Sequence, residues 1–180
     1  MSPERRRLII LFVAALGLRL AWVLAVKRDG FASNDASFYH FSGDSIARGR
    51  GFESPFGLPT ARWPPGYPAL LSLLYRITGW HAVAAEVLNA VLGAITVPLL
   101  YRLAKPHFGS RVAFIAATML CVMPGPILWT DLTVTETLFT LQLVLFFLLI
   151  MRSRPTWAWA AAIGAFVGLV TLTRSEALVW

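Results

Sequence analysis

The stretch Leu8–Val26, LIILFVAALGLRLAWVLAV, decides the fold class of this chain. A helix needs about 20 apolar residues to cross the hydrocarbon core of a bilayer, and only Arg19 interrupts this run. Arg5, Arg6 and Arg7 precede it as in a signal peptide, but the run is long and no clear cleavage site follows, so we interpret it as an uncleaved anchor. Four more segments are similarly apolar. We therefore expect an all-α polytopic membrane protein with about five transmembrane helices, at about residues 8–26, 82–104, 112–130, 132–151 and 155–173.

The composition agrees with this fold class. Of the 180 residues, 57% are hydrophobic and 14% are charged, whereas a soluble domain carries about 25% charged residues. The net charge of +7 comes from basic residues that flank the apolar runs, so it indicates a membrane protein and no nucleic-acid partner. A single cysteine excludes an internal disulfide framework and any multi-cysteine metal site.

The short loops set the expected orientation. They are basic and almost free of acid, which places them in the cytoplasm. The opposite side is also basic, so the raw count of Lys and Arg barely separates the two sides and the short loops decide. We expect a multi-pass protein of the inner (plasma) membrane with a cytoplasmic N-terminus. The residues that carry this prediction are Arg5, Arg6, Arg7, Arg102, Lys105, Arg111, Arg152 and Arg154.

The first extracytoplasmic loop, residues 27–80, is the only long one, and loops of this length are usually functional or disordered. Its aromatic content argues against disorder. A helix is expected from Asp35 to about Ile46–Arg48, ending at Gly49 and Gly51. A shorter apolar run over 68–75 cannot span a membrane and suits a re-entrant or interfacial helix. We therefore expect one or two interfacial helices in this loop.

The acidic residues are distributed unevenly. All nine except Glu4 fall on the expected non-cytoplasmic side. Acids contribute little to membrane topology, so insertion does not explain this bias. A carboxylate-rich chamber at the outer membrane face would explain it, although loops also tolerate acids without any function. The simpler explanation fits Glu86 and Glu136 less well, because both lie inside or at the edge of expected helices, where a charge must face protein or water.

Several motifs carry a resemblance to a known family. They are Asn34-Asp35 with Tyr39, Ile46–Phe52 (IARGRGF), Pro59–Pro68 (PTARWPPGYP), Asn89 with Gly93, Thr135–Leu138 (TETL), and Leu172–Ala177 (LTRSEA). With these motifs the chain resembles the GT-C superfamily of polytopic glycosyltransferases. It is most similar to the bacterial branch related to protein O-mannosyltransferases and to the aminoarabinose transferase of lipid A.

The resemblance covers nearly the whole chain, and family members are considerably longer. Residues 1–180 therefore look like the N-terminal portion of a GT-C-like transmembrane domain, and we expect little or no activity from the isolated chain. Many members carry two adjacent acids in the first loop, whereas Asn34 and Ala36 flank Asp35 here. This disfavours a metal bridged by paired carboxylates. No metal ligand and no cofactor are assigned, and a divalent metal remains an open alternative.

The resemblance implies transfer of a sugar from a polyprenyl-phosphate donor to a hydroxyl of a lipid, glycan or protein at the extracytoplasmic face, with inversion at the anomeric carbon. Such a transfer needs a base for the acceptor proton and cations for the leaving phosphate. The resemblance implies that Asp35 is the general base. The expected donor-phosphate residues are Arg174, Arg62 and Arg48, and the expected acceptor-orienting residues are Glu136, Asp131, Glu176 and Tyr39.

Each of these residues also has a simpler interpretation. Asp35 suits the helix dipole at a helix start, and Glu136 can be a structural carboxylate at the start of its helix. Arg174 can be an interfacial anchor whose side chain reaches the lipid headgroups. Arg62 and Arg48 can be solvated loop cations or headgroup contacts.

Two other functions compete with the enzyme. In a transporter or flippase fragment, Glu136 and Arg19 would be coupling charges, and Pro98, Pro124 and Pro126 would break two of the spans. The charges cluster at one face rather than at the membrane midplane, which favours the enzyme. A non-catalytic structural membrane subunit would be expected to lack a long, acid-bearing first loop.

Overall fold

The computed structural model describes residues 2–26 and 34–176, and this part of the chain is all-helical, with one isolated β-bridge between Glu53 and Pro59. The predicted all-α class is therefore confirmed. The helices in chain order are α1 (Pro3–Val26), α2 (Asn34–Ala47), α3 (Gly66–Thr78), α4 (Ala82–Val122), α5 (Pro124–Leu128), the 3-10 turn η1 (Trp129–Asp131), α6 (Glu136–Arg152) and α7 (Trp157–Thr171).

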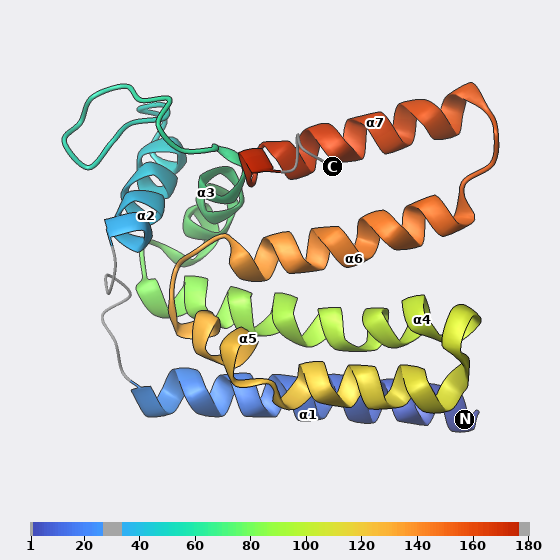
Figure 1. The fold of residues 1–180 in the computed structure, drawn as a ribbon. Helices are drawn as coiled ribbons and strands as arrows, with labels where there is room; N and C mark the ends of the chain where they lie inside the picture. Colours follow the sequence, from blue (N-terminus) through green and yellow to red (C-terminus); the bar gives the residue numbers. More distant parts are fainter. Residues whose placement is uncertain (1, 27–33, 177–180) are drawn as a thin grey trace.

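The long helix α4 consists of two helical segments that meet at Gly109. Gly109 has φ 77° and ψ 167°, a left-handed backbone conformation that favours glycine, and the chain turns back on itself there (Figure 1). Both segments pack on α1 through a core in which small residues predominate. Small side chains let helix backbones approach closely, as is usual between membrane helices. The buried residues of this core are Leu11, Ala15, Ala94, Val97, Tyr101, Ala104, Ala113, Ala117 and Cys121.

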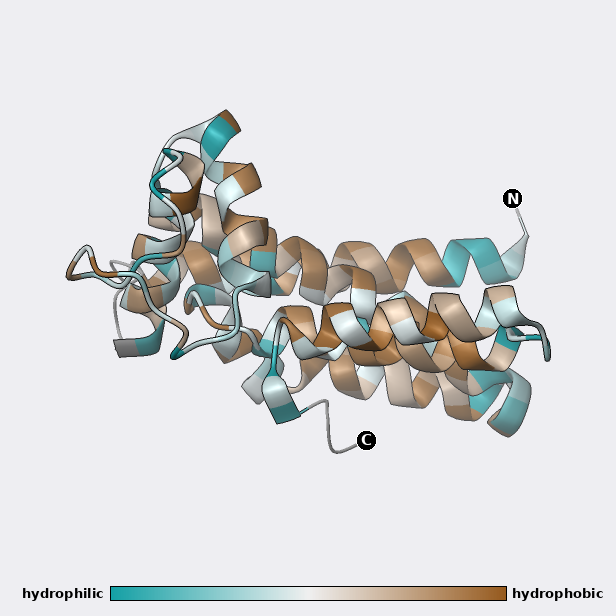
Figure 2. Ribbon diagram, turned by 90° about the horizontal axis from the view of Figure 1, so that it is seen from above, coloured by the Kyte–Doolittle hydropathy of each residue, from teal (hydrophilic) through white to brown (hydrophobic). Residues whose placement is uncertain are grey.

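The long helices lie side by side, with hydrophobic residues along the length of the bundle and hydrophilic ones at its two ends (Figure 2). Among the described residues, α1 and α4 are long and apolar enough to cross a membrane, and α7 is a shorter apolar helix. These features indicate a membrane protein. Five transmembrane helices remain a prediction, because length and composition support spans only at α1 and α4.

The span expected over residues 112–130 does not form as one helix. The helix ends at Val122, Met123 is extended (φ −62°, ψ 124°), and the chain continues as the short α5 and η1. Proline lacks a backbone N–H and disfavours helical geometry in the residue before it, so Pro124 causes the break. The span expected over 132–151 is likewise shorter, because its helix begins only at Glu136.

Arg19 stabilises this break from within the bundle. Pro124 leaves the carbonyl of Leu120 without its usual helical donor, and Nη2 of Arg19 donates to that oxygen at 3.4 Å. Nη1 of Arg19 also donates to the carbonyls of Cys121 at 3.4 Å and Ala15 at 3.2 Å. The side chain is 1% exposed and therefore faces the bundle rather than lipid. It lies against Gly93, where an added Cβ would be 2.6 Å from Nε.

Helices α2 and α3 pack together at one end of the bundle, as expected for helices in the first outer loop (Figure 1). The predicted end of the first helix is confirmed, because α2 stops at Ala47 and Gly49 and Gly51 follow with φ 75° and 95°. His40 ties α2 to its neighbours. Its ring nitrogens form hydrogen bonds with the hydroxyls of Tyr75 on α3 and Thr133 before α6, and burial lowers the pKa of His40 to about 4.

Candidate active site

A cavity of about 210 Å³ lies at this end of the bundle, where α2, the start of α6 and the chain after α7 meet. Four segments that are far apart in sequence contribute to it. The end of the bundle that holds the cavity is opposite to the one that holds the N-terminus (Figure 1). The lining residues are Asp35, Tyr39, Arg62, Trp63, Pro64, Val134, Thr135, Glu136, Thr173, Arg174, Ser175 and Glu176.

Gly66 joins two of these segments. Its N–H donates to the carbonyl oxygen of Leu172 at 2.6 Å, which brings the start of α3 against the end of α7. A Cβ at this position would lie 2.6 Å from the same oxygen and 2.8 Å from its carbon, so only glycine fits without movement of the backbone. This contact places Arg62, Trp63 and Pro64 beside the residues that follow α7. It explains physically why a glycine stands in the PTARWPPGYP motif.

Asn89 and Tyr67 hold the segment that leads into α6. The hydroxyl of Tyr67 donates to Oδ1 of Asn89 at 3.0 Å, and Nδ2 of Asn89 donates to the carbonyl of Leu132 at 2.8 Å. Asn89 is fully buried, so both of its polar groups are satisfied inside the protein. The non-helical residues between η1 and α6 are thereby fixed, and they present Thr135 and Glu136 to the cavity.

Arg174 is the centre of the charged cluster in the cavity. Its Nη1 donates to Oε1 of Glu136 at 3.0 Å, and its Nε and Nη2 each donate to Glu176 at 3.3 Å. Its guanidinium carbon also lies 5.5 Å from the centroid of the Phe139 ring. The hydrogen bonds that Arg174 donates to Glu176 and the charges of both carboxylates raise the pKa of Arg174, and the same contact lowers the pKa of Glu176. The guanidinium is thus permanently cationic and fixed in place.

Glu136 uses only part of its hydrogen-bonding capacity. Its Oε2 is buried and has no hydrogen-bond partner in the part of the chain that the structure describes. A buried carboxylate oxygen without a partner is costly, so a donor supplied by a ligand would be favoured there.

Asp35 and Tyr39 come from the first turns of α2, one helical turn apart. Asp35 is half-buried, whereas Tyr39 is buried. Burial raises the pKa of Tyr39, which keeps its hydroxyl protonated, and a hydrogen bond with Thr135 acts in the opposite direction. The cavity therefore holds a partly accessible carboxylate next to a neutral phenol.

The structure brings together six of the residues that the sequence singles out. Asp35, Tyr39, Arg62, Glu136, Arg174 and Glu176 line the cavity.

The other two lie elsewhere. Arg48 does not line the cavity because its Nε donates to both carboxylate oxygens of Asp44, one turn earlier on α2, at 2.8 Å. Asp131 does not line it because η1 turns this residue inward, where it is 1% exposed and accepts a hydrogen bond from Nε1 of Trp22 at 3.0 Å.

Sequence reasoning missed several lining residues. Trp63 lies beneath the guanidinium of Arg62, whose Cζ is 5.5 Å from the ring centroid. Thr173 is buried and accepts a hydrogen bond from Nε2 of Gln142 at 2.9 Å. Trp63 and Thr173 belong to motifs that the sequence displays, but their types alone do not mark them as site residues. No group of three or more His, Cys, Asp or Glu among the described residues is arranged to hold a metal ion, so no metal centre is assigned.

One comparison with known proteins identifies a family. Residues 62–180 match the family model described as dolichyl-phosphate-mannose-protein mannosyltransferase. Searches of curated proteins and of solved structures each found no match. The family match includes Arg62, Glu136, Arg174 and Glu176, whereas Asp35 and Tyr39 precede it. Because the match covers well over half of the sequence, this chain belongs to the dolichyl-phosphate-mannose-protein mannosyltransferase family.

Proposed function

We propose that this protein is a membrane glycosyltransferase that moves a sugar from a polyprenyl-phosphate donor to a hydroxyl acceptor at the extracytoplasmic face, with inversion. The family points to glycosyltransferase activity of the mannosyltransferase type. The observation that carries the finer proposal is that Asp35, Glu136 and Arg174, from three separate segments, line one cavity. A carboxylate that is partly accessible and a fixed cation in one chamber are what this transfer needs.

In the proposed reaction the acceptor oxygen attacks the anomeric carbon of the sugar from the face opposite the phosphate. The carboxylate of Asp35 takes the proton of the acceptor hydroxyl as the new carbon–oxygen bond forms. The bond between the anomeric carbon and the phosphate oxygen breaks, and its electron pair leaves with the polyprenyl phosphate. The proton on Asp35 then passes to water.

Arg174 and Arg62 are the proposed donor-phosphate residues. Arg174 is held on one side by Glu136 and on the other by Glu176, whose side chain is 65% exposed. Exposed ion pairs contribute little, about 0–1 kcal/mol, so an incoming phosphate can replace Glu176 on the guanidinium at small cost. Glu136, Glu176 and Tyr39 would then orient the acceptor, while Arg48 and Asp131 act elsewhere in the fold.

We also propose five transmembrane spans, with the two segments of α4 counted separately, and a cytoplasmic N-terminus. The polar ends and apolar middle of the bundle support this arrangement (Figure 2). The cavity would then lie at the extracytoplasmic end, opposite the N-terminus (Figure 1). A lipid-linked donor would reach it from the membrane.

The break between α4 and α5 is the one observation that favours the alternative of a transporter or flippase fragment, because transporters bind their substrates at interrupted helices. However, Arg19 at this break donates to backbone carbonyls and closes the helix end. That role is structural, and the charged cavity lies at the end of the bundle rather than at the midplane, so the transferase is the better-supported function.

The test is a transfer assay with a radiolabelled polyprenyl-phosphate sugar in the native membrane, in which the full-length protein is compared with its Asp35→Asn variant. Loss of a general base should lower turnover by roughly 10²- to 10⁴-fold. Asp44→Asn is the matched control, because Asp44 also lies on α2 but pairs with Arg48 and Arg50 away from the cavity. Donor binding is measured in parallel, since the base should not affect it. Turnover unchanged in Asp35→Asn would remove the base assignment.

A further inference from the structure

A small cavity of about 20 Å³ lies inside the bundle around the side chain of Arg19, and we call it the Arg19 cavity. Helices α1, α4, α5 and α6 and the turn η1 all contribute to it. A cavity of about 10–15 Å³ can hold one water molecule if it offers polar partners, so the Arg19 cavity has room for a single small guest. The lining residues are Arg19, Gly93, Thr96, Leu120, Pro126, Trp129, Thr137 and Thr140.

Two buried hydrogen-bond donors at this cavity have no partner within residues 2–26 and 34–176. One is Nε of Arg19, and the other is the hydroxyl of Thr137 on the first turn of α6. The two side chains belong to residues that are 1% and 6% exposed. Gly93 lets them meet, because its added Cβ would lie 2.6 Å from Nε of Arg19 and 3.5 Å from Cγ2 of Thr137. Buried donors without an acceptor are costly, and lipid tails supply none, so a guest that accepts from both is favoured.

Two other hydroxyls at the Arg19 cavity can only accept. Thr96 donates its proton to the carbonyl of Leu92 at 2.8 Å, and Thr140 donates its proton to the carbonyl of Glu136 at 2.7 Å. A hydroxyl has one proton and two lone pairs, so the oxygens of Thr96 and Thr140 keep lone pairs for a guest. The lining therefore offers two donors and two acceptors.

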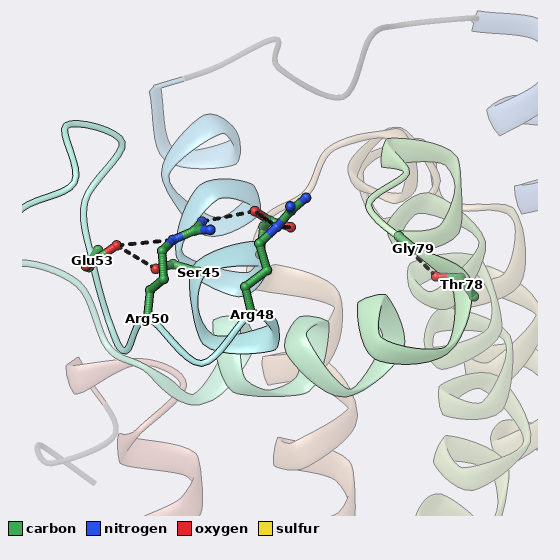
Figure 3. A network of polar contacts seen from close by, with 7 residues as sticks. Ser45, Arg48, Arg50, Glu53, Thr78 and Gly79 are labelled. Atoms are coloured by element: carbon green, nitrogen blue, oxygen red, sulfur yellow. Dashed lines mark hydrogen bonds and ion pairs between the residues drawn. The ribbon is translucent and has the colours of Figure 1, made fainter.

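The charge of Arg19 is also handled differently from the charges of the first outer loop. Arg50 lies 3.2 Å from the carboxylate of Asp44 and 3.6 Å from that of Glu53 (Figure 3). None of the ion pairs among the described residues includes Arg19, whose guanidinium donates to carbonyl oxygens instead. Its charge alone would suit either an anion or a neutral polar guest, so the acceptors in the lining decide between the two.

We propose that the Arg19 cavity is a binding site for one water molecule, which links α1, α4 and α6. The water accepts from Nε of Arg19 and from the hydroxyl of Thr137, and it donates to the oxygens of Thr96 and Thr140. A chloride ion would use the two donors but would face the lone pairs of both acceptors. A metal cation would be repelled by the guanidinium. Water matches the whole lining because it has two protons and two lone pairs.

The bound water extends the role of Arg19 beyond the helix break. Nη1 and Nη2 of Arg19 bind the carbonyls at the break before Pro124, and through the water Nε reaches the first turn of α6. That turn carries Glu136, which pairs with Arg174 in the candidate active site. The inference does not depend on the proposed sugar transfer.

The test is NMR spectroscopy of the full chain in lipid nanodiscs, with isotope-labelled arginine. The Nε–H signal of Arg19 is identified by its loss in Arg19→Lys. Magnetisation transfer from water to this proton is then recorded in the rotating frame, where dipolar transfer and proton exchange have opposite signs. The parent chain should show a dipolar cross-peak at the water frequency, which tests the proposal without any substitution at the acceptors.

The informative variant combines Thr96→Val with Thr140→Val. Valine keeps the branched shape and removes both acceptors, while Thr137 stays unchanged, so the cross-peak should be lost. Thr171→Val is the matched control, because Thr171 also donates to the carbonyl one turn earlier in its helix, at 2.9 Å, but does not line the Arg19 cavity. This control should keep the cross-peak.

A second measurement separates water from an anion. The melting temperature of the parent chain is compared in sodium chloride and in sodium gluconate at equal ionic strength, because a bound ion stabilises the folded state by mass action. Equal melting temperatures are expected, whereas a higher one in chloride would assign the site to an anion and overturn the inference. Lack of the cross-peak in the parent, its persistence in the double variant, or its loss in Thr171→Val would also overturn it.

Discussion

Gly66→Ala is the sharpest perturbation of the assembly of this site. The added Cβ would lie 2.6 Å from the carbonyl oxygen of Leu172, 2.8 Å from its carbon and 3.0 Å from the nitrogen of Thr173. Ordinary contacts begin at 3.4 Å, and these three atoms belong to the backbone, so α3 and the end of α7 must separate by several tenths of an ångström. The change would displace Arg174, which follows directly.

The magnitude follows from two contributions. The hydrogen bond from Gly66 to Leu172 is worth about 1 kcal/mol, and forcing an extra methyl group into a packed site costs about 1–3 kcal/mol. We therefore expect a loss of about 2–4 kcal/mol in the free energy of unfolding, together with weaker donor binding. The assay is thermal unfolding of the purified protein in detergent micelles, with polyprenyl-phosphate binding measured on the same samples.

Gly168→Ala is the matched control. Gly168 lies within α7, nothing would lie within 4 Å of its added Cβ, and alanine favours a helix over glycine by about 1 kcal/mol. Its melting temperature should be unchanged or higher. A Gly66→Ala protein with the melting temperature and the donor affinity of the parent would refute the argument that this close approach builds the cavity.

Two further predictions concern buried residues outside the candidate active site. Arg19→Ala should lower the free energy of unfolding by about 2–4 kcal/mol, because it leaves the carbonyls of Leu120 and Cys121 at the α4 break without a donor and creates a void. The melting temperature of the variant measures this loss. An unchanged melting temperature would contradict the capping role of Arg19. His40, whose pKa burial lowers to about 4, is neutral when folded, and an unfolded histidine protonates near 6.5. Its contribution to stability is therefore fully present above about pH 6.5 and is lost as the pH falls toward 4, by up to roughly 3 kcal/mol. Melting temperatures at pH 7 and pH 5 should differ more in the parent than in His40→Gln, and an equal difference would contradict this assignment.

Helix α2 was predictable because its signals are local. Gly49 and Gly51 follow its expected end, and the structure confirms that the helix stops at Ala47. The apolar runs predicted helices almost everywhere, but hydropathy alone did not show where they end. The span expected over 112–130 is interrupted at Pro124, because proline has no backbone N–H for a helical hydrogen bond and an apolar composition does not compensate for that.

The sequence by itself determined the helical class, the apolar bundle with polar ends, and half of the residues that line the cavity, because periodicity, length and motifs are properties of neighbouring residues. Only the tertiary structure decided which charges meet. Arg48 pairs with Asp44, and Asp131 turns inward toward Trp22. Glu136 and Arg174, in contrast, form an ion pair although they are 38 positions apart in sequence. Such pairings depend on how the helix break at Pro124, the contact of Gly66 with Leu172 and the buried amide of Asn89 position each segment. These are long-range constraints, so no single stretch of the sequence determines them.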